Sequence, residues 1–378
     1  MTLAQPQPPT QAPSRQDALR IAVFDGDGIG PEIMAPTLSL LEAVAADLDA
    51  AFSFERLPAG AAHYRDHGES LPAASLEAAR AADAILLSAM GLPAVRYPDG
   101  TEISPQIELR QRLGLYAGVR PVFRLPGQVG PLRAEVMEGV DFVLIRESTE
   151  GLFASHGKGT VIDDREARET LVITRAVSEK LFDFAFRLAR RRKTTGRGPG
   201  RVHCVDKANV FQSFAFFRKI FHEVAARHPD IEADCAYVDA TALWMVQQPR
   251  MFDVLVTENM FGDILSDLGA GLMGSLGLAP SADIGDGSAL FQPCHGSAPD
   301  IAGRGVANPL AMILSAAMML DWLGTEREAP ALVAGAARLQ EAVARVLAEG
   351  RVRTSDLGGQ DGTEAMAAAV GEAWAAGG

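Results

Sequence analysis

Two carboxylates four residues apart are the first feature whose residue types and spacing could do chemistry. Asp263 and Asp267 lie in the segment NMFGDILSD, residues 259–267, where the pattern predicts the start of a helix. Both side chains then share one helix face, and their repulsion is unfavourable unless a cation, a basic group or the helix dipole offsets it. Such hard oxygen ligands suit Mg²⁺ or Mn²⁺, although a solvated acidic face is the alternative interpretation.

Arg110, Arg120 and Arg146 form a second group, in the segments QIELRQRLGLYAGVRPV and DFVLIRES. Two of them stand in otherwise apolar, strand-like contexts, where a charged group must be paired or solvated. A substrate with several carboxylates would supply bidentate partners, whereas ion pairs with nearby glutamates are the structural alternative. Lys207 follows a predicted strand in VHCVDKANV and could act as an acid or base if its pKa is lowered.

Glycine-rich segments are the third feature. HGSAPDIAGRGVANP, residues 295–309, would let backbone amides approach a phosphate, and Asp300 would accept hydrogen bonds from an adenosine ribose and repel a 2′-phosphate. This predicts a preference for NAD over NADP, with an ordinary surface loop as the alternative. GDGIGPE, residues 26–32, does not meet the Rossmann fingerprint, because Pro31 occupies the place of a required residue, and it could equally be a helix-capping turn.

Alternating strand and helix patterns must position these residues. Residues 20–24, 52–57 and 84–88 read as strands, with helical patterns at 33–48 and 76–82 between them, which predicts a parallel α/β architecture. Strand content rises from about residue 116, helical periodicity returns at 173–192, and residues 308–349 predict two long helices. A chain of 378 residues is expected to form two domains.

Composition excludes several classes of function. A net charge of −13 disfavours binding to nucleic acid or an anionic membrane surface, because both would be repelled. The three cysteines form no CxxC pair, so we expect neither a disulfide framework nor a structural zinc site, and a reducing cytoplasm fits best. Residues 1–19 predict a disordered tail, and the longest apolar run, 310–320, is too short to span a membrane.

Taken together, these segments resemble the β-decarboxylating dehydrogenases, which act on isocitrate, isopropylmalate, homoisocitrate, tartrate and D-malate. The resemblance runs from about Arg20 to the C-terminus and is carried by NMFGDILSDLGAGLMGSLGLAPSA and HGSAPDIAGRGVANP. It implies an isopropylmalate/isocitrate dehydrogenase-like α/β fold of two domains rather than a Rossmann fold. Residues 20–115 and 274–378 would form a large cofactor-binding domain and residues 116–273 a small dimerisation domain, in a homodimer with shared active sites.

The resemblance also implies residue roles. The arginines at 110, 120 and 146 would hold substrate carboxylates, and Asp263 and Asp267 would bind Mg²⁺ or Mn²⁺ together with Asp239 from the other subunit. Lys207 would also cross the interface and handle a proton, so that Lys207 and Asp239 are the predicted catalytic residues. The predicted contacts to NAD are His295, Gly296, Ser297, Ala298, Asp300, Ile301 and Asn308.

Three departures from the family bear on activity and substrate. Phe153 stands seven residues after Arg146, where a tyrosine commonly helps to protonate the enolate, and Gln292 replaces a glutamate that usually precedes the proline of the cofactor loop. Ser104 and Gln106 resemble polar residues of isocitrate enzymes, which favours isocitrate, homoisocitrate, D-malate or tartrate as the hydroxy-polycarboxylate substrate. Isopropylmalate stays open, and a non-catalytic regulatory subunit is the alternative of another class.

Overall fold

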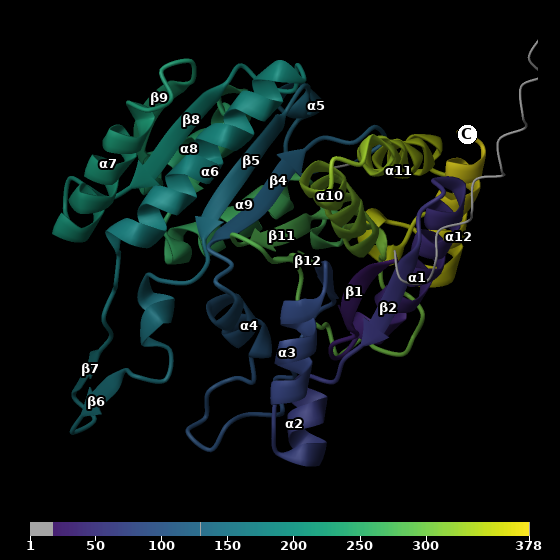
Figure 1. Cartoon of the computed structure of the whole chain (residues 1–378), viewed down its shortest axis with the longest axis horizontal. Coiled ribbons are helices and arrows are strands. Elements are labelled where there is room, and N and C mark those ends of the chain that lie inside the picture. Colours follow the sequence, from purple (N-terminus) through teal and green to yellow (C-terminus); the bar gives the residue numbers. More distant parts are fainter. Residues whose placement is uncertain (1–17, 129, 378) are drawn as a thin grey trace, which may run out of the picture.

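The computed structural model describes residues 18–128 and 130–377. They form an α/β structure around a ten-stranded sheet with the strand order β2-β1-β3-β12-β11-β4-β5-β10-β8-β9 (Figure 1). The strands of this sheet are β1 Leu19–Phe24, β2 Phe52–Arg56, β3 Ala84–Leu87, β4 Ala117–Phe123, β5 Asp141–Glu147, β8 Arg201–Asp206, β9 Glu232–Tyr237, β10 Val254–Thr257, β11 Pro280–Ile284 and β12 Ala289–Pro293. A separate hairpin, β6 Thr160–Ile162 with β7 Glu166–Arg168, projects away from it (Figure 1).

Helices cover the sheet on both sides of its central strands. Their bounds are α1 Gly30–Asp47, α2 Ala61–His67, α3 Ala73–Ala81, α4 Pro105–Leu113, α5 Ala134–Met137, α6 Arg175–Thr194, α7 Gln212–Ala225, α8 Val238–Gln247, α9 Asn259–Leu272, α10 Leu310–Glu326, α11 Pro330–Glu349 and α12 Thr363–Ala375. Helices α1, α10, α11 and α12 gather at one end, whereas α6, α7 and α8 lie at the other (Figure 1).

The predicted parallel arrangement is confirmed at both ends of the sheet and is wrong at its centre. β1 pairs in parallel with β2 and β3, and β10 pairs in parallel with β5 and β8. β4 and β11, however, run antiparallel to each other and to their other neighbours, β5 and β12. A tight turn, in which the Gly285 amide donates to the Ser288 carbonyl at 2.9 Å, makes β11 and β12 a hairpin, and short hairpin connections force antiparallel pairing.

Most predicted elements lie within a few residues of their observed bounds, because apolar periodicity in this chain agrees with the burial that the fold requires. The apolar run 310–320 forms most of α10, which packs with α11, β11 and β12, and is therefore a core helix. No helix in the described part of the chain is long and apolar enough to cross a membrane. Helix α12 was not predicted, and Leu19 belongs to β1, so the predicted tail ends too late; residues 1–17 of that tail lie outside the described residues.

Candidate active site

The strand register at the centre of the sheet brings distant charged residues together. Gly118 on β4 pairs with Asp283 on β11 and with Arg146 on β5, so these three positions share one face of the sheet. Because side chains alternate along a strand, Arg120 lies on the same face, two residues further along β4. Ser281 pairs with Gln292 in the β11–β12 hairpin and continues this face. The antiparallel centre of the sheet thus builds one polar surface from four strands.

Three arginines converge on that surface, and one buried carboxylate lies between two of them. Arg110 Nε donates to Asp283 Oδ2 at 3.1 Å, and an Arg120 guanidinium nitrogen lies 3.3 Å from Asp283 Oδ1. Arg110 comes from the last turn of α4, which Gly114 ends in the left-handed conformation. The structural alternative for the arginines was ion pairing with nearby glutamates. The observed partner is instead an aspartate more than 160 residues away in the sequence, which sequence analysis missed.

Arg146 has a different set of partners. Its Nε donates to Asn259 Oδ1 at 2.8 Å, its guanidinium pairs with Asp263, and it lies over the Phe153 ring, 5.0 Å from the ring centroid. Burial and the nearby positive charge of Arg110 lower the pKa of Arg146 to about 10, and the pairing with Asp263 offsets them only in part. A buried cation of this kind gains from an anionic ligand that brings a compensating charge.

A cavity of about 230 Å³ opens over these groups. All three arginines and both candidate metal aspartates line it, as do Gln106 and Phe153. The complete lining is Ala89, Met90, Gln106, Ile107, Arg110, Arg120, Arg146, Phe153, Asp263, Ser266, Asp267, Ser281, Gln292, Pro293, Cys294, His295 and Gly296. Side chains from segments more than 150 residues apart therefore converge on a space large enough for a small carboxylic acid. Cys294, Ser281 and Met90 were not predicted, since their residue types give no signal in the sequence.

The aspartate pair has the geometry that the spacing predicts. Helix α9 begins after Glu258, whose carboxylate caps it by accepting from the Met260 and Phe261 amides at 3.0 and 3.3 Å. Asp263 and Asp267 both line the cavity, and the Asp263 side chain is 48% exposed. Burial and the neighbouring Asp263 raise the pKa of Asp267. Two hard carboxylates that repel one another at a cavity wall fit a divalent cation, which would relieve that repulsion.

Lys207 and Asp239 lie together, but apart from this cavity. Lys207 Nζ is 2.6 Å from Asp239 Oδ1, the Asp239 side chain is 68% exposed, and neither residue lines the cavity. The ion pair with Lys207 lowers the pKa of Asp239. Among the described residues of one chain, no three metal-binding side chains cluster. Asp263 and Asp267 thus have no third carboxylate beside them in the described part of the chain.

The predicted cofactor loop is held by the glycine-rich turn near the N-terminus. Glu32, at the start of α1, accepts hydrogen bonds from the Gly303 and Ala307 amides at 3.1 and 3.0 Å. The Ile29 amide donates to the Ser297 carbonyl at 2.8 Å, and a Cβ on Gly28, whose φ is +58°, would overlap that carbonyl. The GDGIGPE segment is therefore more than a cap for α1, because it also supports the 295–309 loop. No local pattern around Glu32 in the sequence indicates this role.

The residues of the cofactor loop fall into three groups. His295 and Gly296 line the cavity, and burial lowers the pKa of His295, whose Nε2 has no hydrogen-bond partner. Ser297 and Asn308 are buried and hold the loop in place; Asn308 Nδ2 donates to Asp356 Oδ2 at 2.9 Å. Asp300 is exposed, and Ala298 and Ile301 are half-buried, none of them at the cavity. The unpartnered imidazole nitrogen and the open backbone around Gly296 fit a nucleotide that reaches the cavity along this loop.

Two predicted substrate residues separate in the structure. Gln106 lines the cavity, and its Oε1 is buried without a hydrogen-bond partner. Ser104 lies at the position before α4, caps no amide with its side chain and does not line the cavity. The spacing of two residues near a helix start explains the difference, because residues two apart on a helix face different directions. Of the two, Gln106 alone lines the cavity.

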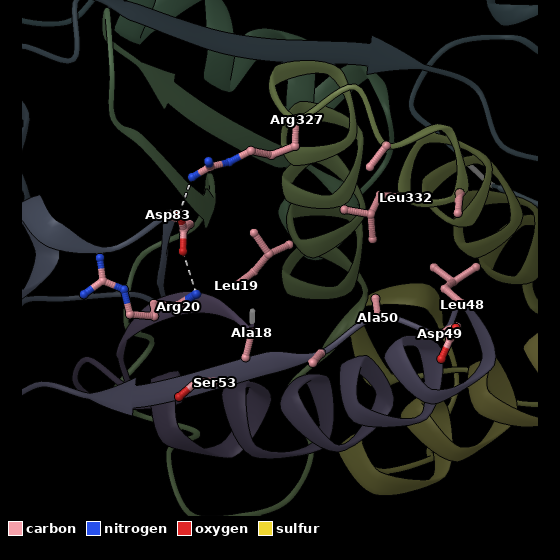
Figure 2. A pocket seen from close by; sticks show the side chains of 13 residues that line it. Ala18, Leu19, Arg20, Leu48, Asp49, Ala50, Ser53, Asp83, Arg327 and Leu332 are labelled. Atoms are coloured by element: carbon pink, nitrogen blue, oxygen red, sulfur yellow. Dashed lines mark hydrogen bonds and ion pairs between the residues drawn. The ribbon is translucent and has the colours of Figure 1, made fainter. Parts of the chain in front are cut away.

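A larger hollow of about 740 Å³ lies elsewhere, between β1, β2 and the turn that joins α10 to α11 (Figure 2). Asp83 lies at one side of it, accepts from the Arg20 backbone amide at 2.7 Å and pairs with Arg327 (Figure 2). Asp83 and Arg327 thus bind each other, the Arg20 guanidinium donates to the Ala81 carbonyl, and the other lining residues are mostly alanine and leucine. The smaller cavity is the better candidate for chemistry.

Comparisons with known proteins show which family the chain belongs to. Residues 20–373 match the family model described as isocitrate/isopropylmalate dehydrogenase. The chain belongs to this family. It is a β-decarboxylating dehydrogenase, as the sequence motifs had indicated.

Relatives of this dehydrogenase cover nearly its whole length. It is 43% identical to a 3-isopropylmalate dehydrogenase of Listeria innocua, over 92% of this chain and 95% of that protein. It is 44% identical to a 3-isopropylmalate/3-methylmalate dehydrogenase of Methanocaldococcus jannaschii, over 93% and 97%. The crystal structure of an isocitrate dehydrogenase from Methylococcus capsulatus is 39% identical, covers 94% of this chain and 99% of that one, and has a TM-score of 0.82.

Proposed function

We propose that this dehydrogenase catalyses the NAD-linked, Mg²⁺- or Mn²⁺-dependent oxidative decarboxylation of a 3-alkylmalate, with 3-isopropylmalate as the first candidate. The observation that carries the proposal is the cavity in which three arginines, the Asp263–Asp267 pair and the start of the cofactor loop converge. Carboxylate-binding cations, hard metal ligands and a nucleotide-binding loop are the three components that this reaction needs.

The choice of a 3-alkylmalate revises the interpretation of the sequence. Ser104 and Gln106 favoured isocitrate, homoisocitrate, D-malate or tartrate, with isopropylmalate as the alternative. Ser104 does not line the cavity, whereas Met90, Ile107 and Phe153 line it and offer apolar surface to an alkyl group. Two relatives more than 40% identical carry names that include 3-isopropylmalate dehydrogenase. The alternative is therefore better supported than the first interpretation.

In the proposed reaction the arginines bind and orient the substrate. Arg110, Arg120 and Arg146 would grip its carboxylates in bidentate fashion, which fixes the hydroxyl carbon toward the side of the cavity that His295 and Gly296 form. Asp263 and Asp267 would hold the divalent cation, which supplies Lewis-acid stabilisation of negative charge on the substrate oxygens. Residues of the 295–309 loop would hold NAD, which would supply the acceptor for the hydride, and Lys207 would take the proton of the hydroxyl group. The β-carboxylate would leave as carbon dioxide, and a proton from water would take its place on the carbon.

The cavity lies where the two proposed domains meet. Gln106, Arg110 and His295 come from the proposed large domain, residues 20–115 with 274–378, and Arg120, Arg146 and Asp263 come from residues 116–273. A cavity shared by two domains suits a reaction in which cofactor and substrate must be brought together and shielded from water.

We further propose that the active site is completed in a homodimer. Asp239 and Lys207 are placed outside the cavity of their own chain, and apolar side chains near them are exposed, among them Leu243 at 52% and Val246 at 38% on α8 and Ile264 at 62% on α9. Exposed apolar side chains on two helices that contact each other favour a protein interface. Such an interface would bring Asp239 and Lys207 of the partner subunit toward Asp263.

Turnover by the purified chain tests the proposal. NADH absorbance is followed with Mg²⁺ or Mn²⁺ and either NAD or NADP, on 3-isopropylmalate, isocitrate, homoisocitrate, D-malate and tartrate. We expect NAD-linked turnover of 3-isopropylmalate with the highest kcat/KM. A higher kcat/KM for isocitrate or homoisocitrate would refute the substrate assignment, and no turnover by the homo-oligomer would favour a regulatory subunit, the hypothesis that Phe153 and Gln292 motivated.

A further inference from the structure

Asp283 is the most deeply buried charged group in the arginine cluster. Its side chain has no exposed surface, and four side chains contact it: Arg110 at 3.1 Å, Arg120 at 3.3 Å, Ser148 Oγ at 3.0 Å and Gln292 Nε2 at 3.0 Å. Burial raises the pKa of Asp283, but the arginines at 110, 120 and 146 outweigh burial and hold its pKa below the usual value. Asp283 is therefore an ionised carboxylate with a complete set of donors.

The backbone around Asp283 is shaped to receive it. Gly118 lies opposite Asp283 in the β4–β11 register, and a Cβ at Gly118 would lie 3.0 Å from Asp283 Oδ1 and would also crowd Ser148 Oγ. A side chain at this position would therefore push the carboxylate out of its place between the arginines. Because Gly118 on β4 has no side chain, the Asp283 carboxylate on β11 can reach across β4 toward β5.

Asp263 and Asp283 differ in whether a bound ligand can draw them away from their arginine partners. Asp263 pairs with Arg146, but its side chain is 48% exposed at the cavity wall, so it can turn to a bound cation. Asp283 is enclosed and cannot leave Arg110 and Arg120 without abandoning buried charges, which costs several kcal/mol in typical proteins. One of the three guanidinium charges is thus neutralised permanently, and two remain for a ligand.

We propose that Asp283 sets the charge of the substrate cavity and thereby selects 2-hydroxy dicarboxylates over tricarboxylates. This inference rests on the proposed function and names the residue that decides its substrate class. Two free cationic charges match two carboxylates. The proposed divalent cation does not change this count, because Asp263 and Asp267 balance its two charges. A third carboxylate in this cavity would lie near Asp283 with no net positive charge to pair with it, and an unpaired buried charge is strongly unfavourable. Asp283 acts through the arginines and is a positioning residue.

Gln292 belongs to the same arrangement. Its amide donates to Asp283 from the neighbouring strand β12, where a glutamate would instead place a second carboxylate about 3 Å from the first. An amide at 292 and a carboxylate at 283 are therefore complementary. Exchanging the two groups would keep the total charge of the cavity and would move the negative charge from position 283 to position 292. The pair Asp283→Asn with Gln292→Glu is such an exchange.

Binding of two inert acids tests the inference without requiring turnover. Dissociation constants for 2-methylsuccinate, a dianion, and tricarballylate, a trianion, are measured by calorimetry on the full chain with Mg²⁺ and NAD. We expect the wild-type protein to bind the dianion more tightly by at least about tenfold, and Asp283→Asn to reduce this preference by about tenfold or more, since it frees one guanidinium charge at close range. Asp283→Asn with Gln292→Glu should restore the preference.

A matched control separates charge from structure. Ser148→Ala removes one hydrogen bond to Asp283 without changing any charge and should leave the dianion-to-trianion ratio unchanged. If Asp283→Asn weakens the binding of both acids by the same factor, Asp283 has only a structural role and the inference is wrong. Should the Asn variant not fold, the wild-type ratio decides, because equal or tighter binding of tricarballylate contradicts the inference. Absence of turnover on every 2-hydroxy acid would instead contradict the proposed function alone.

Discussion

Glu32 connects α1 to the cofactor loop and to α12. The substitution Glu32→Gln tests whether this connection stabilises the fold and prepares the loop for NAD. Its carboxylate accepts hydrogen bonds from Gly303 N at 3.1 Å, Ala307 N at 3.0 Å and Thr363 Oγ1 at 2.8 Å. A glutamine can keep only part of this set, because its NH₂ group faces donors. Water can replace the bond to the exposed Gly303, whereas Ala307 is buried.

The expected loss follows from these differences. With one bond replaced by water and two weakened, the free energy of unfolding should fall by about 1–3 kcal/mol. The same loss loosens residues 295–309 before NAD binds, so the KM for NAD should rise by roughly threefold to tenfold, while kcat and the KM for the hydroxy acid change little. Burial raises the pKa of Glu32, but the donors outweigh it and lower that pKa.

Urea unfolding and steady-state kinetics measure both effects. Because the pKa of Glu32 is depressed in the folded state, its stabilisation is present above about pH 4.5 and is lost as pH falls below that value. The difference between wild type and variant should therefore shrink in acid. Glu42→Gln, on the exposed face of the same helix, is the control and should change neither quantity. An unchanged KM for NAD in Glu32→Gln, or an equal rise in both KM values, would refute the reasoning.

Three further predictions concern the metal, the cofactor and pH. Asp263→Asn should lower metal-dependent kcat/KM by roughly a hundredfold or more and weaken Mn²⁺ binding measured by calorimetry; an unchanged Mn²⁺ affinity would show that Asp263 is not a ligand. Asp300→Ala should raise the NADP-to-NAD ratio of kcat/KM by about tenfold, and an unchanged ratio would remove its role in cofactor choice. Burial raises the pKa of Glu147 to about 7, so the folded state keeps a proton that the unfolded chain loses above about pH 4.5. Stability should fall as pH rises through that window, by at most about 1.4 kcal/mol per pH unit, and Glu147→Gln should remove this slope in urea unfolding; equal slopes would contradict it.

The elements of the fold were largely predictable from local pattern. Strands near residues 20–24 and 84–88 and the helix from 173 to 192 lie close to their predicted places, because buried strands and amphipathic helices need apolar residues at fixed periods. The antiparallel pairing of β4 and β11 was not predictable in this way. Strand direction depends on which strands meet across the sheet, and no local period encodes it.

The candidate site shows the same division. Asp263 and Asp267 could be paired from their spacing, because a helix fixes the relation between residues four apart. Asp283 gave no local signal, since it lies in a short apolar strand and meets its partners Arg110 and Arg120 only through the sheet register and the end of α4. Glu32 was missed for the same reason, because the amides that it binds lie more than 270 residues away.

The sequence by itself determined the family, the reaction class and the residues with reactive side chains, because long motifs and helical spacing are properties of the chain read in order. Only the tertiary structure decided which of those residues share one cavity, that Ser104 is not among them, and that a buried aspartate neutralises part of the arginine cluster. The physical reason is that the charge of a cavity is a sum over groups close in space, and closeness in space is set by strand register and helix packing rather than by distance along the chain.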